Sequence, residues 1–412
     1  MERIYGLLGR KLGHSWSAPI HHELGCGSYC LIELEPEALE GFLRREDIGG
    51  LNVTIPYKRA VMACCDEIDP LAKRIGSVNT IVRREGKLLG FNTDAAGFLY
   101  MARAAGISFA GKKVVVLGSG GASLTVQATA ASEGAREVVV ISRSGENNYE
   151  NLHLHADADI VVNATPVGMF PRCGESPVDL KAFPRCHGVL DLIYNPRRTA
   201  LLLQAEALGI PCSDGLPMLV AQAAAAEEHF FEKPIPGSET ERILRTLRRE
   251  MTNIVLIGMP GSGKTTVGDA LAAMTGREAL DVDREIVRRT GRSIPDIFRT
   301  DGEEAFRALE RQVTAELGAL TGKVILTGGG VVKDERNYAP LRQNGRIYHL
   351  WRELEVLPVE GRPLSQGSGA ETLWNERKAL YEGFRDVLVD NNGAVEDTAN
   401  AIWRDFCEDL GT

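Results

Sequence analysis

Short apolar runs alternate along the chain with longer stretches in which apolar residues return every three or four positions. The runs have the length and β-branched content of strands, and the longer stretches have the periodicity of amphipathic helices. Several runs are apolar on both faces, which is typical of strands buried in a parallel sheet. The pattern therefore predicts an α/β protein with parallel sheets and crossover helices. The predicted strands are residues 113–117, 137–141, 160–163, 189–192, 254–257, 324–327 and 347–350.

The alternation falls into three parts. Residues 1–105 form an α/β unit of their own, residues 106–215 begin again with a strand, a glycine-rich turn and a helix, and residues 251–412 open with another such unit. A segment rich in proline and glycine, 233–238, interrupts a helical pattern that otherwise runs to the join between the second and third parts. We expect residues 216–250 to form the helical end of the first domain.

The length of 412 residues is more than one ordinary domain holds. The composition, 44% hydrophobic and 25% charged, is typical of soluble globular proteins. No apolar run approaches the ~20 residues that span a bilayer, and the first residues lack the pattern of a signal peptide. We therefore expect a cytoplasmic protein without a membrane partner.

The charge of the chain argues against nucleic acid as a partner. The net charge is −9; residues 1–250 carry 27 Lys and Arg against 30 Asp and Glu, and residues 251–412 carry 20 against 26. Proteins that bind nucleic acid usually present a basic surface, and neither part is basic overall. An anionic ligand must therefore be bound by local cations and backbone amides.

The eight cysteines form no CxxC pair and have no histidine at the spacing of a zinc finger. This spacing favours free thiols in a reducing compartment, so we expect neither a disulfide nor a metal cluster.

A phosphate-binding motif opens the third part. Residues 258–266 read GMPGSGKTT, which is GxxxxGK[ST] between a predicted strand and a predicted helix. Glycines allow successive backbone N–H groups to face phosphates, and the helix N-terminus adds positive potential. Lys264 is expected to reach the β- and γ-phosphates of ATP, and the Thr265 hydroxyl is expected to bind Mg²⁺. The predicted ATP-binding residues of this loop are Gly261, Ser262, Gly263, Lys264, Thr265 and Thr266.

Five further motifs follow the phosphate loop in sequence. They are DVD at 281–283, GEEAFR at 302–307 with Phe298 upstream, GGG at 328–330 after a predicted strand, GRPL at 361–364, and RKALY at 377–381. The Gly/Ser tract at 367–370 predicts a mobile loop. Together and in this order the motifs resemble shikimate kinase over nearly all of residues 252–406.

This resemblance implies a role for each motif. Asp281 would help to bind Mg²⁺, and Asp283 would bind the shikimate hydroxyls and act as a base. Two guanidinium groups can clamp one carboxylate, which is the role implied for Arg307 and Arg377. The remaining implied roles are backbone contacts to shikimate from Gly329 and Gly330, aromatic walls from Phe298 and Phe306, and closure over the ATP phosphates by Arg362. The chain departs from the family in a short stretch before Arg362, and in having Asn-Asn-Gly after Asp390 in place of a basic residue near adenine.

The second part carries a dinucleotide-binding pattern. The strand at 113–117 is followed by a glycine turn and a helix, as in Rossmann-like domains. The next strand ends in Ser142-Arg143-Ser144, where NAD enzymes usually place an acidic residue for the ribose hydroxyls. A cation between two hydroxyls suits the 2′-phosphate of NADP, although Arg143 could also be an ordinary exposed residue at a strand end. The predicted turn residues are Gly118, Ser119, Gly120, Gly121 and Ala122.

Clusters of polar residues mark the first part and the start of its closing helix. They are GHSWS at 13–17, NVTIPYK at 52–58, SVNT at 77–80, NTD at 92–94 and DGLPMLVAQ at 214–222. Each could be turn chemistry alone, but their joint occurrence resembles shikimate dehydrogenase over residues 4 to about 248. The implied fold is a substrate-binding α/β domain plus a Rossmann-like NADP domain, followed by a P-loop domain like that of nucleoside-monophosphate kinases.

The second resemblance also implies individual roles. Lys58 and Asp94 would form the catalytic pair, since a lysine beside a carboxylate can deliver a proton to a ketone oxygen as hydride reaches the carbon. Ser15 and Ser17, helped by Tyr194, would bind the substrate carboxylate, while Thr54, Asn79, Asp94 and Gln222 would bind its hydroxyls. Asn163, Thr165, Leu192 and Gly215 would flank the cofactor. The chain departs from the family between Ser144 and Asp159, which is short enough to predict that part of the outer dinucleotide sheet is absent.

Both resemblances together predict a bifunctional enzyme. NADPH would reduce 3-dehydroshikimate to shikimate, and ATP with Mg²⁺ would phosphorylate shikimate to shikimate 3-phosphate, so that the first product is the second substrate. One alternative is a quinate/shikimate dehydrogenase with broad cofactor use, fused to the kinase. Another is a metabolite-sensing regulator that keeps these folds; retention of Lys58, Asp94, Lys264, Asp281 and Asp283 argues against it, because a sensor has no need of catalytic groups.

Overall fold

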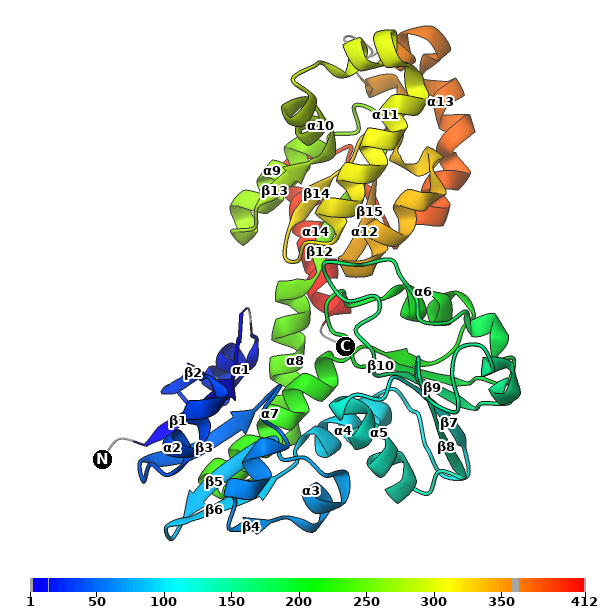
Figure 1. The fold of residues 1–412 in the computed structure, drawn as a ribbon. Coiled ribbons are helices and arrows are strands. Elements are labelled where there is room, and N and C mark those ends of the chain that lie inside the picture. Colours follow the sequence, from blue (N-terminus) through cyan, green and yellow to red (C-terminus); the bar gives the residue numbers. More distant parts are fainter. Residues whose placement is uncertain (1–2, 14, 358–362, 411–412) are drawn as a thin grey trace. The chain divides into compact units, whose positions relative to one another are not determined.

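The computed structural model describes residues 3–13, 15–357 and 363–410, and for residues 363–368 it describes the backbone alone (Figure 1). The chain divides into two compact units. Unit 1 holds residues 1–167, 176–194 and 204–244, and unit 2 holds residues 168–175, 195–203 and 245–412. Within the described residues, no helix has both the length and the apolar character needed to cross a membrane.

Unit 1 begins with a mixed six-stranded sheet in the order β2-β1-β3-β5-β6-β4. The strands β1 and β3 run parallel, whereas β5 and β6 form an antiparallel hairpin. The hairpin turns at Glu85 and Gly86, both with positive φ, as a two-residue turn between twisted strands requires. The strands are β1 (Ile4–Gly9), β2 (Tyr29–Glu33), β3 (Ile48–Val53), β4 (Glu67–Ile68), β5 (Thr80–Arg84) and β6 (Lys87–Phe91), and the helices are α1 (Ser17–Glu23), α2 (Leu39–Leu43), α3 (Pro70–Ile75) and α4 (Asp94–Ala104).

A second sheet in unit 1 has five parallel strands in the order β11-β10-β9-β7-β8. It confirms the predicted strands of this region, with the fourth displaced by one residue. The strand β8 lies at the sheet edge, and the short stretch that follows it forms, among its described residues, only the 3-10 helix Leu152–His155 before β9. The elements are β7 (Lys113–Leu117), α5 (Gly121–Ser132), β8 (Glu137–Ile141), β9 (Ile160–Asn163), β10 (Gly188–Asp191), α6 (Ala200–Ala207) and β11 (Cys212–Ser213).

Two helices end the first half of the chain, α7 (Leu216–Phe231) and α8 (Gly237–Met251). The helix α7 returns to the first sheet, because a Cβ added at Gly50 on β3 would lie 2.2 Å from the Phe230 ring. It also packs closely on α4, where a Cβ at Gly97 would lie 2.5 Å from the Met218 carbonyl oxygen. The predicted helical end at 216–250 therefore forms as two helices, broken by the proline-containing segment.

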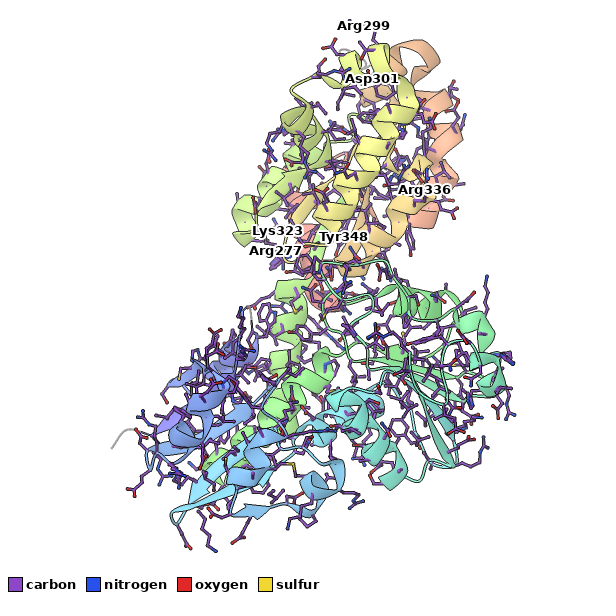
Figure 2. All side chains as sticks on the ribbon, in the orientation of Figure 1. Arg277, Arg299, Asp301, Lys323, Arg336 and Tyr348 are labelled. Atoms are coloured by element: carbon purple, nitrogen blue, oxygen red, sulfur yellow. The ribbon has the colours of Figure 1, made fainter. Side chains whose placement is uncertain are left out.

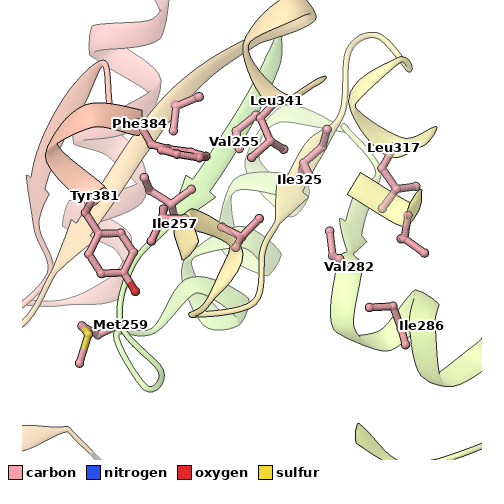
Figure 3. Close-up of a cluster of buried hydrophobic side chains, with 14 of the residues drawn as sticks. Val255, Ile257, Met259, Val282, Ile286, Leu317, Ile325, Leu341, Tyr381 and Phe384 are labelled. Carbon is pink, nitrogen blue, oxygen red and sulfur yellow. The ribbon is translucent and has the colours of Figure 1, made fainter. Parts of the chain in front are cut away.

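Unit 2 contains a third sheet, with five parallel strands in the order β13-β14-β12-β15-β16. All five residues of β12 are buried, because alternate side chains enter two different cores. Val255 and Ile257 join the cluster of Figure 3 with α10, α11 and α13, whereas Ile254 and Leu256 pack toward α9 and α14. The elements are β12 (Asn253–Ile257), α9 (Lys264–Thr275), β13 (Ala279–Asp281), α10 (Val282–Thr290), α11 (Ile294–Gly318), β14 (Val324–Leu326), α12 (Tyr338–Asn344), β15 (Gly345–Trp351), α13 (Pro363–Phe384), β16 (Val387–Asp390) and α14 (Val395–Asp409).

Arg277, labelled in Figure 2, ties the start of this sheet to α14. Its guanidinium donates hydrogen bonds to the carbonyls of Arg249 and Thr252 and lies 4.9 Å from the centre of the Phe406 ring. The carbonyls at a helix end have no partner within the helix, so this arginine caps α8 as it leads into β12.

The Gly/Ser tract at 367–370 is not the open loop that we expected. Its backbone belongs to α13, which is interrupted at Gly369 with φ 72° and ψ 154°. Glycine adopts positive φ without a steric penalty, so the helix kinks there and continues.

The close contact between α4 and α7 predicts an asymmetry between two helical glycines. Replacing Gly97 with Ala places a methyl group against the Met218 carbonyl, so we expect a loss of about 1–3 kcal/mol in the free energy of unfolding. Gly41 in α2 is the control, because a Cβ there meets nothing within 4 Å and Ala should gain up to about 1 kcal/mol. Urea unfolding followed by circular dichroism measures both; equal effects would contradict the packing described.

Candidate functional site

An ammonium–carboxylate pair lies beside the first sheet. Lys58, in the loop after β3, donates from Nζ to Oδ2 of Asp94 at 2.5 Å. The side chain of Asp94 is 8% exposed and that of Lys58 is 27% exposed, so the lysine is the partner that a ligand can reach. Asp94 is the first residue of α4, where the helix N-terminus stabilises a negative charge. The backbone of Lys58 is itself fixed, because its carbonyl accepts from Val78 N at 2.8 Å.

Asn79 connects this pair to α7. Its Oδ1 accepts from Thr93 N at 2.7 Å and from the Thr80 hydroxyl at 3.0 Å. Its Nδ2 donates to Thr93 Oγ1 at 3.1 Å and lies 3.5 Å from Gln222 Oε1. The structure thus brings together Lys58, Asn79, Asp94 and Gln222, four of the residues predicted for the dehydrogenase site.

The predicted carboxylate-binding serines lie at the carboxyl end of β1. Ser17 begins α1, and its backbone N–H donates to Ser15 Oγ at 3.2 Å. Thr54 leaves the neighbouring parallel strand β3, with its N–H donating to Leu8 O at 2.9 Å. Ligands of open α/β sheets bind at such strand ends. Tyr194 follows β10, and burial raises its pKa; no hydrogen bond among the described residues joins it to either serine.

The predicted cofactor residues meet in two places at the second sheet. A Cβ at Gly118, where φ is +101°, would lie 2.9 Å from Thr165 Cγ2, so only glycine fits between β7 and α5 there. Thr165 is held by Asn163 Oδ1, which accepts from its N–H at 3.0 Å and from its hydroxyl at 2.7 Å. A Cβ at Gly215 would lie 2.1 Å from the Leu192 carbonyl oxygen. Gly120 precedes α5 and leaves its first amides open to a phosphate.

The short segment after β8 folds back on itself. Ser142 N donates to Asn147 O at 3.1 Å, and the His155 ring lies 3.0 Å from Asn147 Oδ1. Arg143 and Ser144 remain exposed at the turn. Tyr149, which the sequence did not single out, lies near Arg143: burial raises its pKa, and the guanidinium offsets part of the rise.

The phosphate loop of unit 2 has the predicted strand–loop–helix form. The helix α9 begins at Lys264, whose Nζ donates to the carbonyls of Gly258 at 2.9 Å and Met259 at 3.0 Å. Thr265 Oγ1 lies 3.5 Å from Asp281 Oδ2, so two oxygen donors for a cation adjoin each other. Mg²⁺ in kinases needs only one or two carboxylates, with substrate phosphates and water completing its shell, and these residues fit that requirement. Among the described residues, no three acidic, histidine or cysteine side chains are placed to bind one metal ion together.

A cavity of about 860 Å³ extends from this loop. It gathers almost every residue predicted for the kinase from five separate segments. Among the residues that line it are Gly261, Gly263, Lys264, Thr265, Thr266, Asp281, Asp283, Phe298, Phe306, Arg307, Gly329, Gly330 and Arg377. Arg362 lies outside the described residues.

Charged side chains outside the phosphate loop also line the cavity. Arg307 Nη1 donates to Glu310 Oε2 at 2.7 Å, and Arg377 Nη1 donates to Gly329 O at 2.9 Å. The Asp283 carboxylate lies near two other carboxylates, those of Asp281 and Glu310. Burial, followed by these two charges, raises the pKa of Asp283 to about 6, although Lys264 and Arg307 oppose the rise. Phe298 and Phe306, with ring centres 4.7 Å apart, form an apolar wall.

Both halves match families of known enzymes. Residues 7–81 match the family model "Shikimate dehydrogenase substrate binding domain", and residues 260–407 match the model "Shikimate kinase". The NADP(+) shikimate dehydrogenase of Methanopyrus kandleri is 41% identical over 280 residues, which cover 60% of this chain and 96% of that relative. The chain belongs to the shikimate dehydrogenase family. Its C-terminal part is a shikimate kinase domain.

Further relatives support the same assignment of the N-terminal part. The NADP(+) shikimate dehydrogenase of Halothermothrix orenii is 38% identical over 276 residues, covering 57% of this chain and 94% of the relative. A chorismate mutase/shikimate 5-dehydrogenase fusion protein from Clostridium acetobutylicum is 38% identical with a TM-score of 0.58, covering 60% of this chain and 97% of that one. The Thermus thermophilus shikimate 5-dehydrogenase, solved with NADP(H) and shikimate, is 36% identical with a TM-score of 0.53, covering 59% and 98%. Both resemblances predicted from the sequence are confirmed.

Two residues that the sequence did not single out support this part of the shikimate kinase domain: Glu310 lines the cavity, and Asn391 contacts the phosphate loop. Glu310, with its side chain 1% exposed, pairs with Arg307 one helical turn earlier, and that spacing was the available signal. Asn391 donates from Nδ2 to the Ser262 carbonyl at 2.6 Å and so braces the phosphate loop. The Asn-Asn-Gly stretch, noted only for lacking a basic residue, therefore supports the loop that precedes α9.

His349 on β15 is connected to the cavity wall through Tyr381. The residue is 1% exposed, and its ring stacks on the Tyr381 ring with the ring centres 4.6 Å apart. The Tyr381 hydroxyl in turn donates to the Gly329 carbonyl, which lines the cavity, at 2.6 Å. Burial lowers the pKa of His349 to about 4, with Arg385 and Lys264 adding to the effect.

The lowered pKa of His349 predicts acid sensitivity of the shikimate kinase domain. The unfolded chain binds this proton near pH 6.5 and the folded domain only near pH 4, so the stabilising contribution is complete above pH 6.5 and is lost as the pH falls towards 4. Relative to His349→Phe, which keeps the stacked ring, the wild type should lose about 2 kcal/mol more between pH 7 and pH 5. Urea unfolding followed by tryptophan fluorescence measures this, since Trp374 lies 6.0 Å from the His349 ring. Parallel pH profiles would refute the prediction.

Proposed function

We propose that this chain reduces 3-dehydroshikimate to shikimate with NADPH and then phosphorylates shikimate to shikimate 3-phosphate with ATP and Mg²⁺. The proposal is supported by the two families to which its parts belong. The observation that carries it is the coexistence of two separate catalytic sets, the Lys58–Asp94 pair and the phosphate loop with Asp283 and two arginines. A regulator would need neither set.

In the proposed reduction, the bound NADPH supplies hydride to the ketone carbon. Lys58, the accessible partner of the 2.5 Å pair, donates a proton from Nζ to the ketone oxygen, and Asp94 orients the ammonium. Gln222, Thr54 and Asn79 would bind the substrate hydroxyls, with Asn79 fixed by Thr93 and Thr80. Ser15, Ser17 and Tyr194 would bind the carboxylate.

The proposed cofactor site follows the carboxyl ends of the second sheet. The turn 118–122 would bind the pyrophosphate at the N-terminus of α5. Thr165, Leu192 and Gly215 would flank the nicotinamide side. Ser142, Arg143 and Ser144 would bind the 2′-phosphate, since Arg143 is an exposed cation next to two hydroxyls.

In the proposed phosphoryl transfer, the amides of the phosphate loop and Lys264 bind the ATP phosphates. Thr265 and Asp281 would hold Mg²⁺, which neutralises charge on the transferred group when bound. Asp283 would accept the proton of the attacking shikimate hydroxyl. The remaining proposed contacts are Arg307 and Arg377 to the shikimate carboxylate, Gly329 and Gly330 through backbone, Phe298 and Phe306 as walls, and Arg362 over the phosphates.

We propose that the three parts of the chain predicted from the sequence have separate roles. Residues 1–105, with helices 216–250, would bind the dehydrogenase substrate, residues 106–215 would bind NADP, and residues 251–412 would act as the kinase. The cytoplasm would suit a chain whose eight cysteines are all free thiols in the structure. The proposed partners are small molecules alone.

Two alanine substitutions should separate the activities. Lys58→Ala should lower kcat for 3-dehydroshikimate reduction by about 10²–10⁴-fold with a smaller change in KM, because a general acid acts in the transition state. Its kinase rate should stay unchanged. Lys264→Ala should show the reverse, with a loss of about 10²–10³-fold in phosphorylation alone. Both rates are measured on one purified preparation; a variant that loses both activities would contradict two independent sites.

Arg143→Ala tests cofactor choice. A charge-assisted contact is worth about 1.5–3 kcal/mol, so kcat/KM with NADPH should fall by roughly 10- to 150-fold while that with NADH barely changes. Arg185→Ala, another exposed arginine of unit 1, is the control. A wild type that prefers NADH, or an unchanged preference in the variant, would make Arg143 an ordinary surface residue.

A further inference from the structure

One arginine in the wall of the kinase cavity has no partner. Among the described residues, the cationic side chains that line this cavity are Lys264, Arg307, Arg352 and Arg377. Lys264 and Arg377 donate to backbone carbonyls, and Arg307 pairs with Glu310. No hydrogen bond or ion pair joins the Arg352 guanidinium to another described residue. Its Nε is enclosed by protein, whereas its terminal Nη atoms stay accessible, so they are available to a ligand.

Arg352 lies beside the phosphate loop. Strands β15 and β12 pair in parallel with His349 opposite Ile257, and the loop begins directly after Ile257. A Cβ added at Gly258 would lie 2.6 Å from the Leu350 carbonyl oxygen, so the end of β15 touches the start of the loop. Arg352 follows two residues later in the chain. The strand pairing therefore places this cation next to the backbone that we propose to bind the ATP phosphates.

The strand order separates Arg352 from the residues proposed to bind shikimate. In the order β13-β14-β12-β15-β16, Asp283 follows β13 and the glycine turn 328–330 follows β14, both on one side of β12. Arg352 and Asn391 follow β15 and β16, on the other side. Asn391 donates to the Ser262 carbonyl of the loop at 2.6 Å, so this side also contacts the phosphate loop. An anionic ligand that reaches Arg352 is therefore the nucleotide, and not shikimate.

The charge of the cavity gives an unpaired cation a purpose. Three carboxylates, those of Asp281, Asp283 and Glu310, line the same cavity. Burial and the two neighbouring carboxylates raise the pKa of Asp283 to about 6. The phosphates of ATP bring further negative charge to this space. A guanidinium can meet that charge with two parallel N–H donors to one phosphate group.

We propose that Arg352 binds the phosphates of ATP, as an additional nucleotide-binding residue of the kinase domain; this inference rests on the kinase activity proposed above. The accessible Nη atoms donate to phosphate oxygens from the side of the loop on which β15 ends. The planar fork of a guanidinium matches phosphate oxygens, whereas a lysine ammonium supplies the charge without the fork. Arg352 therefore contributes to the affinity for the nucleotide and not to that for shikimate.

The test is a calorimetric titration of the full chain with the non-hydrolysable ATP analogue AMP-PNP in the presence of Mg²⁺. Arg352→Ala and Arg352→Gln should each weaken binding by roughly 10- to 150-fold, as expected for loss of a charge-assisted contact. Arg352→Lys should lie between these variants and the wild type, because it keeps the charge and loses the fork. Arg404→Ala is the control, since Arg404 is an exposed arginine of α14 outside the cavity lining and should leave the affinity unchanged.

Three results would overturn the proposal. They are wild-type affinity for AMP-PNP in Arg352→Ala and Arg352→Gln, an Arg352→Lys variant as weak as Arg352→Ala, and a rise in the KM for shikimate in place of the KM for ATP. The second result would indicate stacking on the base in place of a phosphate contact. Circular dichroism checks that each variant folds. A wild type that binds AMP-PNP but does not phosphorylate shikimate would contradict the proposed function instead, and the titration would still decide the role of Arg352.

Discussion

Burial of parallel strands on both faces is the constraint on which the two proposed active sites depend. A strand such as β12, with all five residues buried, cannot carry a polar catalytic group along its length. Polar chemistry is therefore placed beyond the strand ends, in the loops and in helices of the same domain, and in a parallel sheet these ends meet at one edge. The phosphate loop follows β12, the two aspartates 281 and 283 flank the end of β13, and the glycine turn 328–330 follows β14. Residues as far apart in sequence as Pro260 and Arg377 thus line one cavity.

The same constraint orders unit 1. The parallel pair β1 and β3 brings the serines at 15 and 17 to the edge that also carries Thr54, and β7, β8, β9 and β10 deliver the proposed NADP residues to the edge of the second sheet. Glycine is required where these loops crowd each other. Gly118 approaches Thr165, and Gly215 approaches Leu192, so closely that a Cβ would collide. The loops that carry the proposed NADP residues are therefore fixed by steric contact as well as by hydrogen bonds.

The two sites differ in whether their buried carboxylates are neutralised within the protein. The dehydrogenase pair is compensated within itself, since Lys58 neutralises Asp94 before any substrate arrives. The kinase cavity instead crowds Asp281, Asp283 and Glu310 together, and burial with like charge raises the pKa of Asp283 to about 6. Arg307 and Lys264 offset only part of this repulsion. A Mg²⁺ ion would relieve it, which is a physical reason for such a site to bind a divalent cation.

Local sequence was enough for the elements and for the motifs. The strands β7, β8 and β9 lie at the predicted residues, because short runs apolar on both faces are a local signal, and the phosphate loop was recognisable because its residues are contiguous. The loop expected at 367–370 was wrong because a single glycine, Gly369, only kinks a helix that the flanking residues continue. Asn391 and the Asn79–Thr93 contact came from the tertiary structure alone, since each depends on which segments meet across the fold. The pairing of Glu310 with Arg307, in contrast, follows a local helical spacing. Burial decided the direction in which the pKa values of Asp283 and His349 shift, and burial is a property of the packed chain that no stretch of sequence contains.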